Sequence, residues 1–169
     1  MQRDQHSALR LEHVSLKSPG GAAGSQYLLQ DISFELFKAD CLGIVGAAGA
    51  GKTSLLRLLN RLSEPTAGKI FYQNQAIEQI PVIELRRQIM LVPQESRLLG
   101  MTVRQALAYP LRLRGLDQIT IQQRTQDMVE QLQIPADWLE RTETQLSVGQ
   151  RQLVAIGRAI ITQPQVLLL

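Results

Sequence analysis

Apolar and polar residues alternate in two segments near the start of the chain. Leu9 to Lys17 and Leu29 to Phe37 both follow the period of two that is typical of strands with one buried face. A loop of small residues, Pro19 to Ser25, joins the two segments. We therefore expect a β-hairpin at the start of the chain.

An apolar run and an amphipathic segment follow the hairpin. The run from Cys41 to Val45 predicts a strand, with Cys41 as a small buried residue, and a glycine-rich turn comes after it. The segment Ser63 to Gly68 is expected to end the helix that follows the turn. Four residues of this helix fall on one face and predict a buried stripe: Leu55, Leu58, Leu59 and Leu62.

The rest of the chain continues the mixture of strands and helices. Strand-like segments occur at Lys69 to Tyr72 and at Ile89 to Val92, and a helix is expected between them over Val82 to Gln88. Near the end, Gly149 to Thr162 has a helical pattern that stops before a proline, and Val166 to Leu169 predicts a buried strand. The pattern therefore predicts an α/β fold.

Residues Thr102 to Glu140 are predicted to be mostly helical and are interpreted as a helical insert. Thr102 and Gln105 fit a capping box at the start of a helix. Pro110 has no N–H group and clashes with the preceding turn, so we expect two helices or a kink at this position. A second helical face is predicted from Thr125, Met128, Val129 and Leu132.

Composition indicates an ordinary globular protein of one domain. Of its 169 residues, 44% are apolar and 20% are charged. The net charge of +3 is spread along the chain, so no nucleic-acid partner is expected. The single cysteine excludes a disulfide framework or a zinc cluster. No window contains the roughly 18 to 20 apolar residues that cross a bilayer, and no secretory signal begins the chain, so we expect a cytoplasmic location.

The residues from Gly46 to Thr53 read GAAGAGKT and match the Gly-x4-Gly-Lys-Ser/Thr pattern of a Walker A loop. Glycines let successive N–H groups point at an anion, and Lys52 would reach the β and γ phosphates of a nucleotide. Thr53 would hold magnesium, and the dipole of the next helix adds positive charge. A glycine-rich turn that binds nothing is the alternative. The predicted contacts are Gly46, Ala47, Ala48, Gly49, Ala50, Gly51, Lys52, Thr53 and Ser54.

A second motif lies near the end of the chain, where Leu146 to Gln152 read LSVGQRQ and are followed by LVAIGRAI and VLLL. Together with the Walker A loop, this stretch resembles the signature of the ABC (ATP-binding cassette) family, usually LSGGQ. The resemblance implies a P-loop NTPase with a RecA-like core, an N-terminal antiparallel β subdomain and an inserted helical subdomain. The whole chain, 1–169, would be a partial ABC ATPase domain. Residues 1–95 would form the β subdomain and nucleotide-binding core, 96–146 the helical subdomain, and 147–169 the signature helix and a truncated Walker B strand.

In this family the signature of one subunit faces the Walker A loop of the other. The resemblance therefore implies a head-to-tail dimer that holds ATP and Mg²⁺ at two sites, with Ser147, Gly149 and Gln150 contacting ATP in trans. Ser147 is also a good N-cap with Gln150 at N3, so a plain capped helix is the alternative. Val148 stands where the family usually has glycine, a departure that bears on how closely the backbone approaches phosphate.

Gln94 in LVPQE matches the Q-loop glutamine of the family. That residue helps to hold magnesium and the attacking water, so the resemblance implies Gln94 and Thr53 as Mg²⁺ ligands and Gln94 and Lys52 as catalytic residues. A solvated loop glutamine is the alternative. The family commonly stacks adenine on an aromatic residue upstream of Walker A, but Ser18 stands at that position here. Tyr27 is interpreted as a core residue rather than a stacking platform.

Four apolar residues lead, in the family, into the Walker B aspartate and then the glutamate that acts as general base. Here the strand ends at Leu169, so the core is expected to be incomplete at its carboxyl terminus. His6 and His13 are interpreted as strand histidines and not as replacements. Hydrolysis by this chain alone is expected to be very slow, because the loss of a general base costs roughly 10²- to 10⁴-fold in rate.

The resemblance implies an ATP-binding subunit, ATP-hydrolysing in the complete family domain, that powers transport of a solute across a membrane. Its partners would be a second ABC subunit, separate transmembrane permease subunits and a solute-binding protein, at the inner face of the plasma membrane. Residues Glu95 to Met101 would contact the permease, with Leu98 and Leu99 exposed for docking. The alternatives are a truncated, non-hydrolysing nucleotide-binding fragment and a soluble non-transport ABC ATPase. A GTPase is disfavoured because no Asn-Lys-x-Asp motif occurs, and import is favoured over export.

Overall fold

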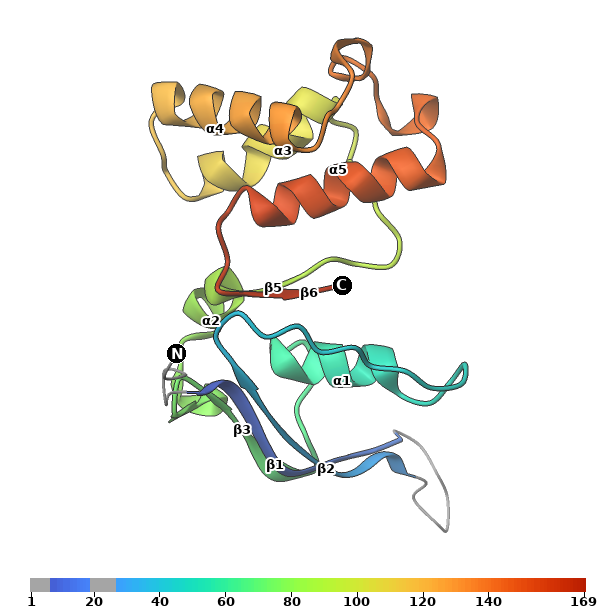
Figure 1. Ribbon diagram of the computed structural model, residues 1–169, viewed down its shortest axis with the longest axis vertical. Helices are drawn as coiled ribbons and strands as arrows, with labels where there is room; N and C mark the ends of the chain where they lie inside the picture. The colour runs from blue at the N-terminus through green and yellow to red at the C-terminus, as the bar shows by residue number, and fades with distance from the viewer. Residues whose placement is uncertain (1–6, 19–26) are drawn as a thin grey trace. The chain divides into compact units, whose positions relative to one another are not determined.

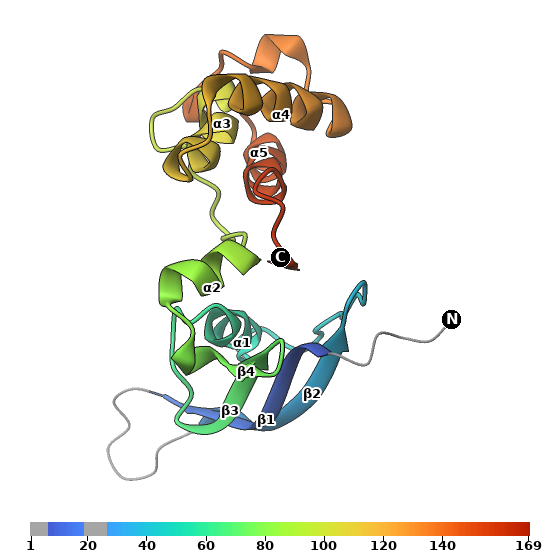
Figure 2. The ribbon, with the colours of Figure 1, turned by 90° about the vertical axis from the view of Figure 1, so that its left-hand side faces the viewer.

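The chain forms two units, unit 1 over Met1–Ile89 and unit 2 over Met90–Leu169. The structure, a computed structural model, describes residues 7–18 and 27–169 and is drawn from two sides in Figures 1 and 2. The predicted loop of small residues, Pro19 to Ser25, lies outside the described residues. In the part of the chain that the structure describes, no helix has the length and apolar character needed to cross a membrane.

Unit 1 contains a four-stranded antiparallel sheet with the strand order β2-β1-β3-β4. Leu11 of β1 pairs with Phe34 of β2 on one side and with Ile70 of β3 on the other. The predicted hairpin is therefore confirmed, and the third predicted strand joins it. The strands are β1 (Ser7–Lys17), β2 (Tyr27–Phe37), β3 (Ala67–Tyr72) and β4 (Gln75–Ala76).

Helix α1 (Lys52–Leu59) lies against this sheet in both views (Figures 1 and 2). Three of its four predicted stripe residues are buried, whereas Leu62 is 46% exposed. The helix ends at Leu59 because Arg61 is left-handed (φ 55°) and the N–H of Leu62 turns back to donate to Arg57 O. The predicted end of the helix at Ser63 to Gly68 is therefore wrong by several residues.

The remaining elements of unit 1 are a short 3₁₀ turn, η1 (Ile77–Gln79), and helix α2 (Val82–Gln88), which has the predicted bounds. Apolar residues from the sheet, α1, η1 and α2, with the residue that follows α2, form the core of this unit. They are Leu9, Leu11, Val14, Leu29, Leu55, Leu58, Leu59, Ile70, Ile77, Leu85 and Ile89.

Cys41 to Val45 do not form the predicted strand. Cys41 is exposed, and Val45 is 93% exposed. A buried strand needs neighbours for its N–H and C=O groups, and no described strand pairs with this run. Because an apolar run is not buried by its composition alone, the predictions of a strand and of a buried Cys41 are wrong.

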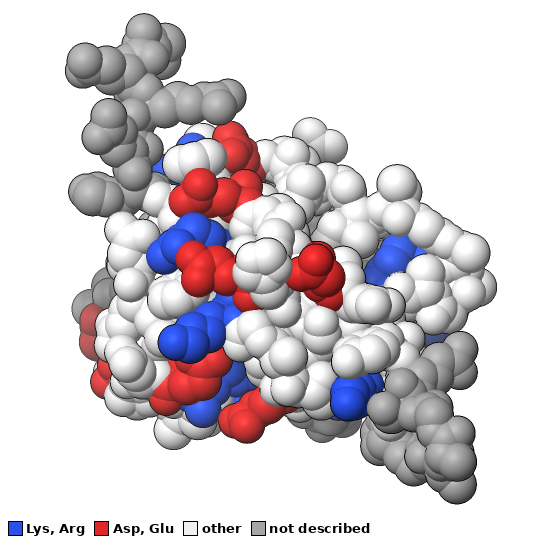
Figure 3. All heavy atoms as spheres, turned by 90° about the horizontal axis from the view of Figure 1, so that it is seen from below, with Lys and Arg blue, Asp and Glu red and all other residues white. Residues whose placement is uncertain are grey.

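Charges of both signs are intermixed on the face drawn in Figure 3. Within the sheet of unit 1, Arg10 forms an ion pair with Glu12, and its guanidinium lies 4.4 Å from the centroid of the Phe71 ring.

Two strands pair at the positions where the apolar pattern predicts them. They are β5 (Ile89–Leu91) and β6 (Val166–Leu168), which form a two-stranded sheet. Beyond β5, the N–H of Val92 donates to Leu168 O at 2.8 Å. Leu169, at the end of the predicted buried strand, is 70% exposed.

Three helices dominate unit 2, α3 (Val103–Leu113), α4 (Gln118–Gln131) and α5 (Val148–Ile160). Two 3₁₀ turns, η2 (Ala136–Trp138) and η3 (Glu143–Gln145), lie between α4 and α5. The helices share one apolar core, so the mostly helical interpretation of this part is confirmed. Its main members are Leu98, Val103, Ala106, Leu107, Leu111, Ile121, Met128, Val129, Leu146 and Val154.

Two local predictions for these helices are confirmed. Thr102 and Gln105 form the predicted capping box at the start of α3. On α4, three members of the predicted face are buried and the fourth is partly buried and packs on the same core. In order, these four residues are Thr125, Met128, Val129 and Leu132.

Helix α3 continues through Pro110 and ends after Leu113. The chain leaves the helix at Gly115, which has a φ of +73°. Leu107 and Leu111, on either side of the proline, are fully buried. We attribute the continuity of α3 to this packing, which offsets the cost of a proline in a helix interior, about 3 kcal/mol. The predicted division into two helices at Pro110 is therefore wrong, and the alternative of a kink stays a prediction.

The two leucines expected to be exposed for docking have opposite environments. Leu98 is 1% exposed and belongs to the core of unit 2, whereas Leu99 is 70% exposed. The turn that follows has Leu99 and Gly100 at positive φ, 57° and 78°, which directs the chain away from the core after Leu98. The expectation is confirmed for Leu99 and wrong for Leu98.

We expect Leu98→Ala to lower the free energy of unfolding by roughly 2–5 kcal/mol, because it leaves a cavity in a packed core. Leu99→Ala serves as the matched control and should change it by no more than about 0.5 kcal/mol. Urea denaturation followed by circular dichroism measures both values. Equal midpoints for the two variants would contradict the assignment of Leu98 to the core.

Candidate functional site

The predicted phosphate loop leads directly into α1. Gly49 and Gly51 have φ values of +80° and +87°, which glycine adopts without steric cost. A side chain at Gly51 would place its Cβ 2.7 Å from Leu28 O. Glycine is therefore required at Gly51 both for the backbone conformation and for the contact with β2.

The start of α1 offers positive charge to an anion. Gly51 is the N-cap and has no side chain to bond the first turn, and that turn contains no acidic residue. The ammonium of Lys52 donates to Gly46 O and Ala47 O, both at 2.8 Å. These two hydrogen bonds fix its positive charge beside the loop. Loop residues Gly46 to Ala50 and the side chain of Thr53 are exposed. The segment can therefore accept a phosphate chain without competition from an acidic residue in the first turn of α1.

The signature motif forms the start of α5. Ser147 is the N-cap, its hydroxyl accepts from Gln150 N at 3.2 Å, and Gln150 Oε1 accepts from Ser147 N at 2.7 Å. Val148 is 73% exposed, and a Cβ added at Gly149 would meet no atom within 4 Å. This capping box is the geometry of the plain capped helix. It also leaves the first turn of α5 accessible and free of acidic residues, so both interpretations of the motif stay open.

Gln94 lies in an exposed loop of unit 2, after β5. Its amide oxygen and the hydroxyl of Thr53 are the kind of ligands that Mg²⁺ takes, so the donor set fits this ion. Thr53 belongs to unit 1 and Gln94 to unit 2. Their meeting at one ion therefore stays a prediction.

Tyr27 is not a core residue, contrary to the interpretation from the sequence. It begins β2, pairs across the hairpin with Lys17, and is 43% exposed. The ammonium of Lys17 lies 5.4 Å from the centroid of its ring. The first residue of a strand has few neighbours to cover it, which explains the exposure of the ring.

His13 is an exposed residue of the hairpin. Its Nδ1 lies 2.7 Å from Asp31 Oδ1, and its N–H donates to Ser33 Oγ at 2.9 Å. Both His13 and Asp31 have positive φ, where the register of β1 and β2 shifts. This pairing is a local feature of the bulged hairpin and agrees with the interpretation of His13 as a strand histidine. His6 lies outside the described residues.

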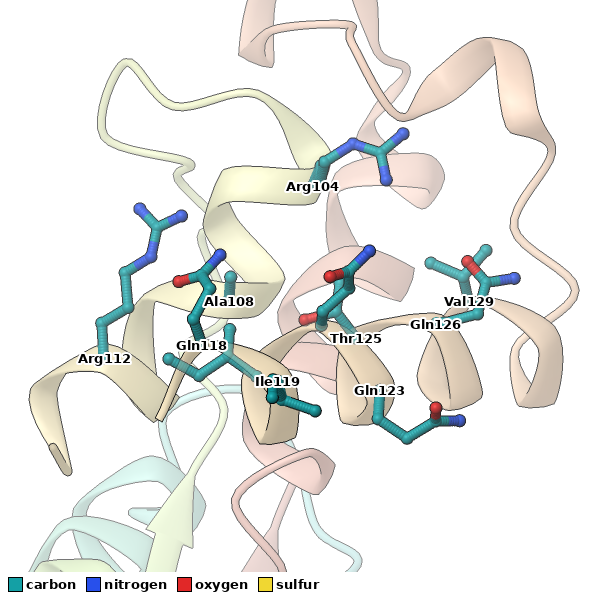
Figure 4. A pocket seen from close by; sticks show the side chains of 11 residues that line it. Arg104, Ala108, Arg112, Gln118, Ile119, Gln123, Thr125, Gln126 and Val129 are labelled. Atoms are coloured by element: carbon teal, nitrogen blue, oxygen red, sulfur yellow. The ribbon is translucent and has the colours of Figure 1, made fainter. Parts of the chain in front are cut away.

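A pocket of about 510 Å³ lies between α3 and α4 and was not predicted from the sequence. Figure 4 shows side chains of α3 and α4 around it. Thr125 lines the pocket and is 6% exposed, and its Oγ1 is without a hydrogen-bond partner in the described part of the chain. The one available signal was a threonine within an otherwise apolar helical face. The lining residues are Arg104, Ala108, Arg112, Gln118, Ile119, Ile121, Gln122, Gln123, Thr125, Gln126 and Val129.

Comparison with known proteins identifies relatives over most of the chain. A methionine import ATP-binding protein, MetN, of Caulobacter vibrioides is 36% identical over 151 residues, which is 87% of this chain and 45% of that protein. MetN of Bradyrhizobium diazoefficiens is 38% identical over 166 residues, or 95% of this chain and 47% of that protein. The chain thus spans about half the length of these curated relatives.

Solved structures show the same fold. The ATP-binding cassette MJ0796, in a dimeric post-hydrolysis state bound to ADP and phosphate, has a TM-score of 0.83 at 23% identity. The alignment covers 94% of this chain and 72% of the MJ0796 chain. CbiO1 of Clostridium perfringens, part of an ABC transporter complex, has a TM-score of 0.82 at 23% identity and covers 96% of this chain and 64% of its own.

The sequence profile of the ABC transporter family matches residues 29–169. This range includes both the glycine loop before α1 and the capped start of α5. The fold is the expected P-loop NTPase fold, α/β with an antiparallel β subdomain. The chain therefore belongs to the ABC transporter family.

Proposed function

We propose that this chain binds ATP with Mg²⁺ and, paired head-to-tail with a second ABC subunit, drives import of a solute through separate membrane-spanning subunits. One observation carries the proposal: the ammonium of Lys52 is hydrogen-bonded to the glycine loop. This loop leads directly into α1, whose first turn has no side-chain cap. The names of the relatives, import ATP-binding proteins, support the direction of transport. Such a subunit works at the cytoplasmic face of the membrane, and a solute-binding protein would deliver the cargo.

In the loop, a charged side chain and backbone N–H groups both contribute to binding. Lys52 exchanges the carbonyl oxygens of Gly46 and Ala47 for the β and γ phosphates, while the N–H groups of the loop and of α1 surround the phosphate chain. Thr53 and Gln94 would hold Mg²⁺, which when bound neutralises charge on the phosphates. Gln94 also orients the attacking water. These groups position the reactants, and none of them is assigned as a general base.

In the proposed dimer, the start of α5 completes the site of the other subunit. Ser147, the N–H group of Gly149 and the side chain of Gln150 approach the phosphates from the side opposite Lys52. The exposed Val148 adds an apolar side chain at the first helical position. This arrangement gives each subunit half of two sites, as head-to-tail pairing requires.

We expect Lys52→Ala to weaken ATP binding about 10- to 100-fold, because charge-assisted hydrogen bonds to phosphate are lost. Lys38→Ala, which removes an exposed lysine of the preceding loop, is the matched control and should bind as the parent chain does. Isothermal titration calorimetry with Mg–ATP measures the three dissociation constants. Equal affinities of the parent chain and Lys52→Ala would contradict the proposal.

We further propose that the pocket between α3 and α4 receives a segment of the membrane-spanning subunit. Its lining includes Arg104 and Arg112 and no acidic residue. Arg104 is paired with Glu140, which leaves Arg112 as the more available charge. The lining therefore suits a segment with an acidic side chain and an apolar face.

We expect Arg112→Glu to reduce assembly with the membrane-spanning subunits at least about 10-fold, because the substitution reverses the charge of the pocket. Arg124→Glu makes the same change on α4 outside the lining residues and should assemble normally. The measurement is co-purification in detergent with candidate membrane-spanning subunits. ATP affinity should be unchanged in both variants, and normal assembly of Arg112→Glu would exclude this pocket as the docking surface.

A further inference from the structure

The residues that follow Gln94 are hydrogen-bonded to α5 and to the turn before it. The N–H of Leu98 donates to Glu143 Oε2 at 2.9 Å, and the side chain of Leu98 is 1% exposed in the helical core. Both the backbone N–H and the side chain of Leu98 are therefore held in place. The position of this loop residue depends on a carboxylate 45 residues further along the chain.

Two more contacts fix the residues immediately before Leu98. The hydroxyl of Ser96 donates to Gln152 Oε1 at 2.5 Å, and Ser96 is 9% exposed. The guanidinium of Arg158 donates to Arg97 O at 3.0 Å. Burial lowers the pKa of the Arg158 guanidinium, which stays charged at neutral pH. Three consecutive residues thus each have a partner on α5 or on η3.

Glu143 is itself anchored to α5. It is the first residue of η3, and Arg151 NH1 donates both to Glu143 O at 3.3 Å and to Leu146 O at 2.9 Å. Leu146 is buried and precedes the N-cap Ser147. The carboxylate that holds Leu98 is therefore part of the same rigid turn that begins the signature helix.

We infer that Glu143 is a positioning residue that joins the loop after Gln94 to the helix that begins at Ser147. The three contacts, Ser96 with Gln152, Arg97 with Arg158 and Leu98 with Glu143, are called the clasp below. Through the clasp, the loop and α5 open and close as one cooperative segment. The consequence for nucleotide binding rests on the proposed function. A ligand that contacts Gln94 then also stabilises the ordered conformation at Ser147, and a ligand that contacts Ser147 stabilises the ordered conformation at Gln94.

The exchange of backbone amides with deuterium tests the clasp without any ligand. In the parent chain, we expect the amide of Leu98 to exchange at the same rate as the most protected amides of α5. Glu143→Ala should speed exchange at Leu98 about 10- to 100-fold and leave the amides of Val154 and Ala155 unchanged. Glu143→Gln, which keeps an acceptor but loses the charge, should give a smaller increase.

Glu130→Ala is the matched control, because Glu130 is an exposed glutamate of α4 that contacts Gln126. Its exchange pattern should equal that of the parent chain. A uniform increase over all of unit 2 in Glu143→Ala would assign Glu143 a merely stabilising role and overturn the inference. An unchanged rate at Leu98 would overturn it as well.

A second measurement adds Mg–ATP and tests the transmission between the two ends. In the parent chain, at a protein concentration low enough to keep it monomeric so that no second subunit brings Ser147 onto the nucleotide, ATP should slow exchange both in residues 94–98 and in residues 147–150. In Glu143→Ala, protection should persist in residues 94–98, which include Gln94, and should be lost in residues 147–150. Protection of both segments in Glu143→Ala would overturn transmission through the clasp. If the parent chain does not bind ATP, the calorimetric titration shows this directly. That result would overturn the proposed function and this transmission together. The exchange measured without ligand would still decide the role of Glu143.

Discussion

The close approach of Gly51 to the backbone of β2 determines the form of the glycine loop before α1 in unit 1. Leu28 O occupies the space that a side chain at Gly51 would need. The loop can therefore pass beside β2 and enter α1 at once, and α1 packs its leucines on the same sheet. Because the sheet supports both the loop and the helix, the charge of Lys52 is carried by a part of the chain with a complete apolar core. In the proposed function, charge that is preorganised in this way would bind phosphate without a large ordering cost.

Features that depend on neighbours a few residues away could be predicted from the sequence. The capping boxes at Thr102 and Ser147 each need only a residue three positions further on, and both form. The glycine pattern of the phosphate loop also fixes a local conformation, and Gly49 and Gly51 adopt it. The family profile over residues 29–169 supports the same interpretation at the level of the fold.

Features that depend on distant partners could not be predicted. Cys41 to Val45 have the composition of a buried strand, but strand formation needs a neighbour that local sequence does not specify. Pro110 has a strong local preference against a helix interior, which the burial of α3 outweighs. Leu98 and Leu99 are identical in sequence terms and differ only because the turn after them directs one side chain into the core. The pocket beside Thr125 depends on how two helices pack, and the threonine within an apolar helical face is its one signal in the sequence.

The exposure of Cys41 also provides a natural site for attaching a spectroscopic label. It is the single cysteine among the 169 residues, and it lies in the segment that leads into the phosphate loop, five positions before Gly46. A maleimide fluorophore or spin label can be attached there without removing any other thiol. The backbone around the label is exposed, so attachment disturbs no packed contact of the core. Changes in the environment of the loop can thus be followed by fluorescence or paramagnetic resonance in the chain with its own sequence.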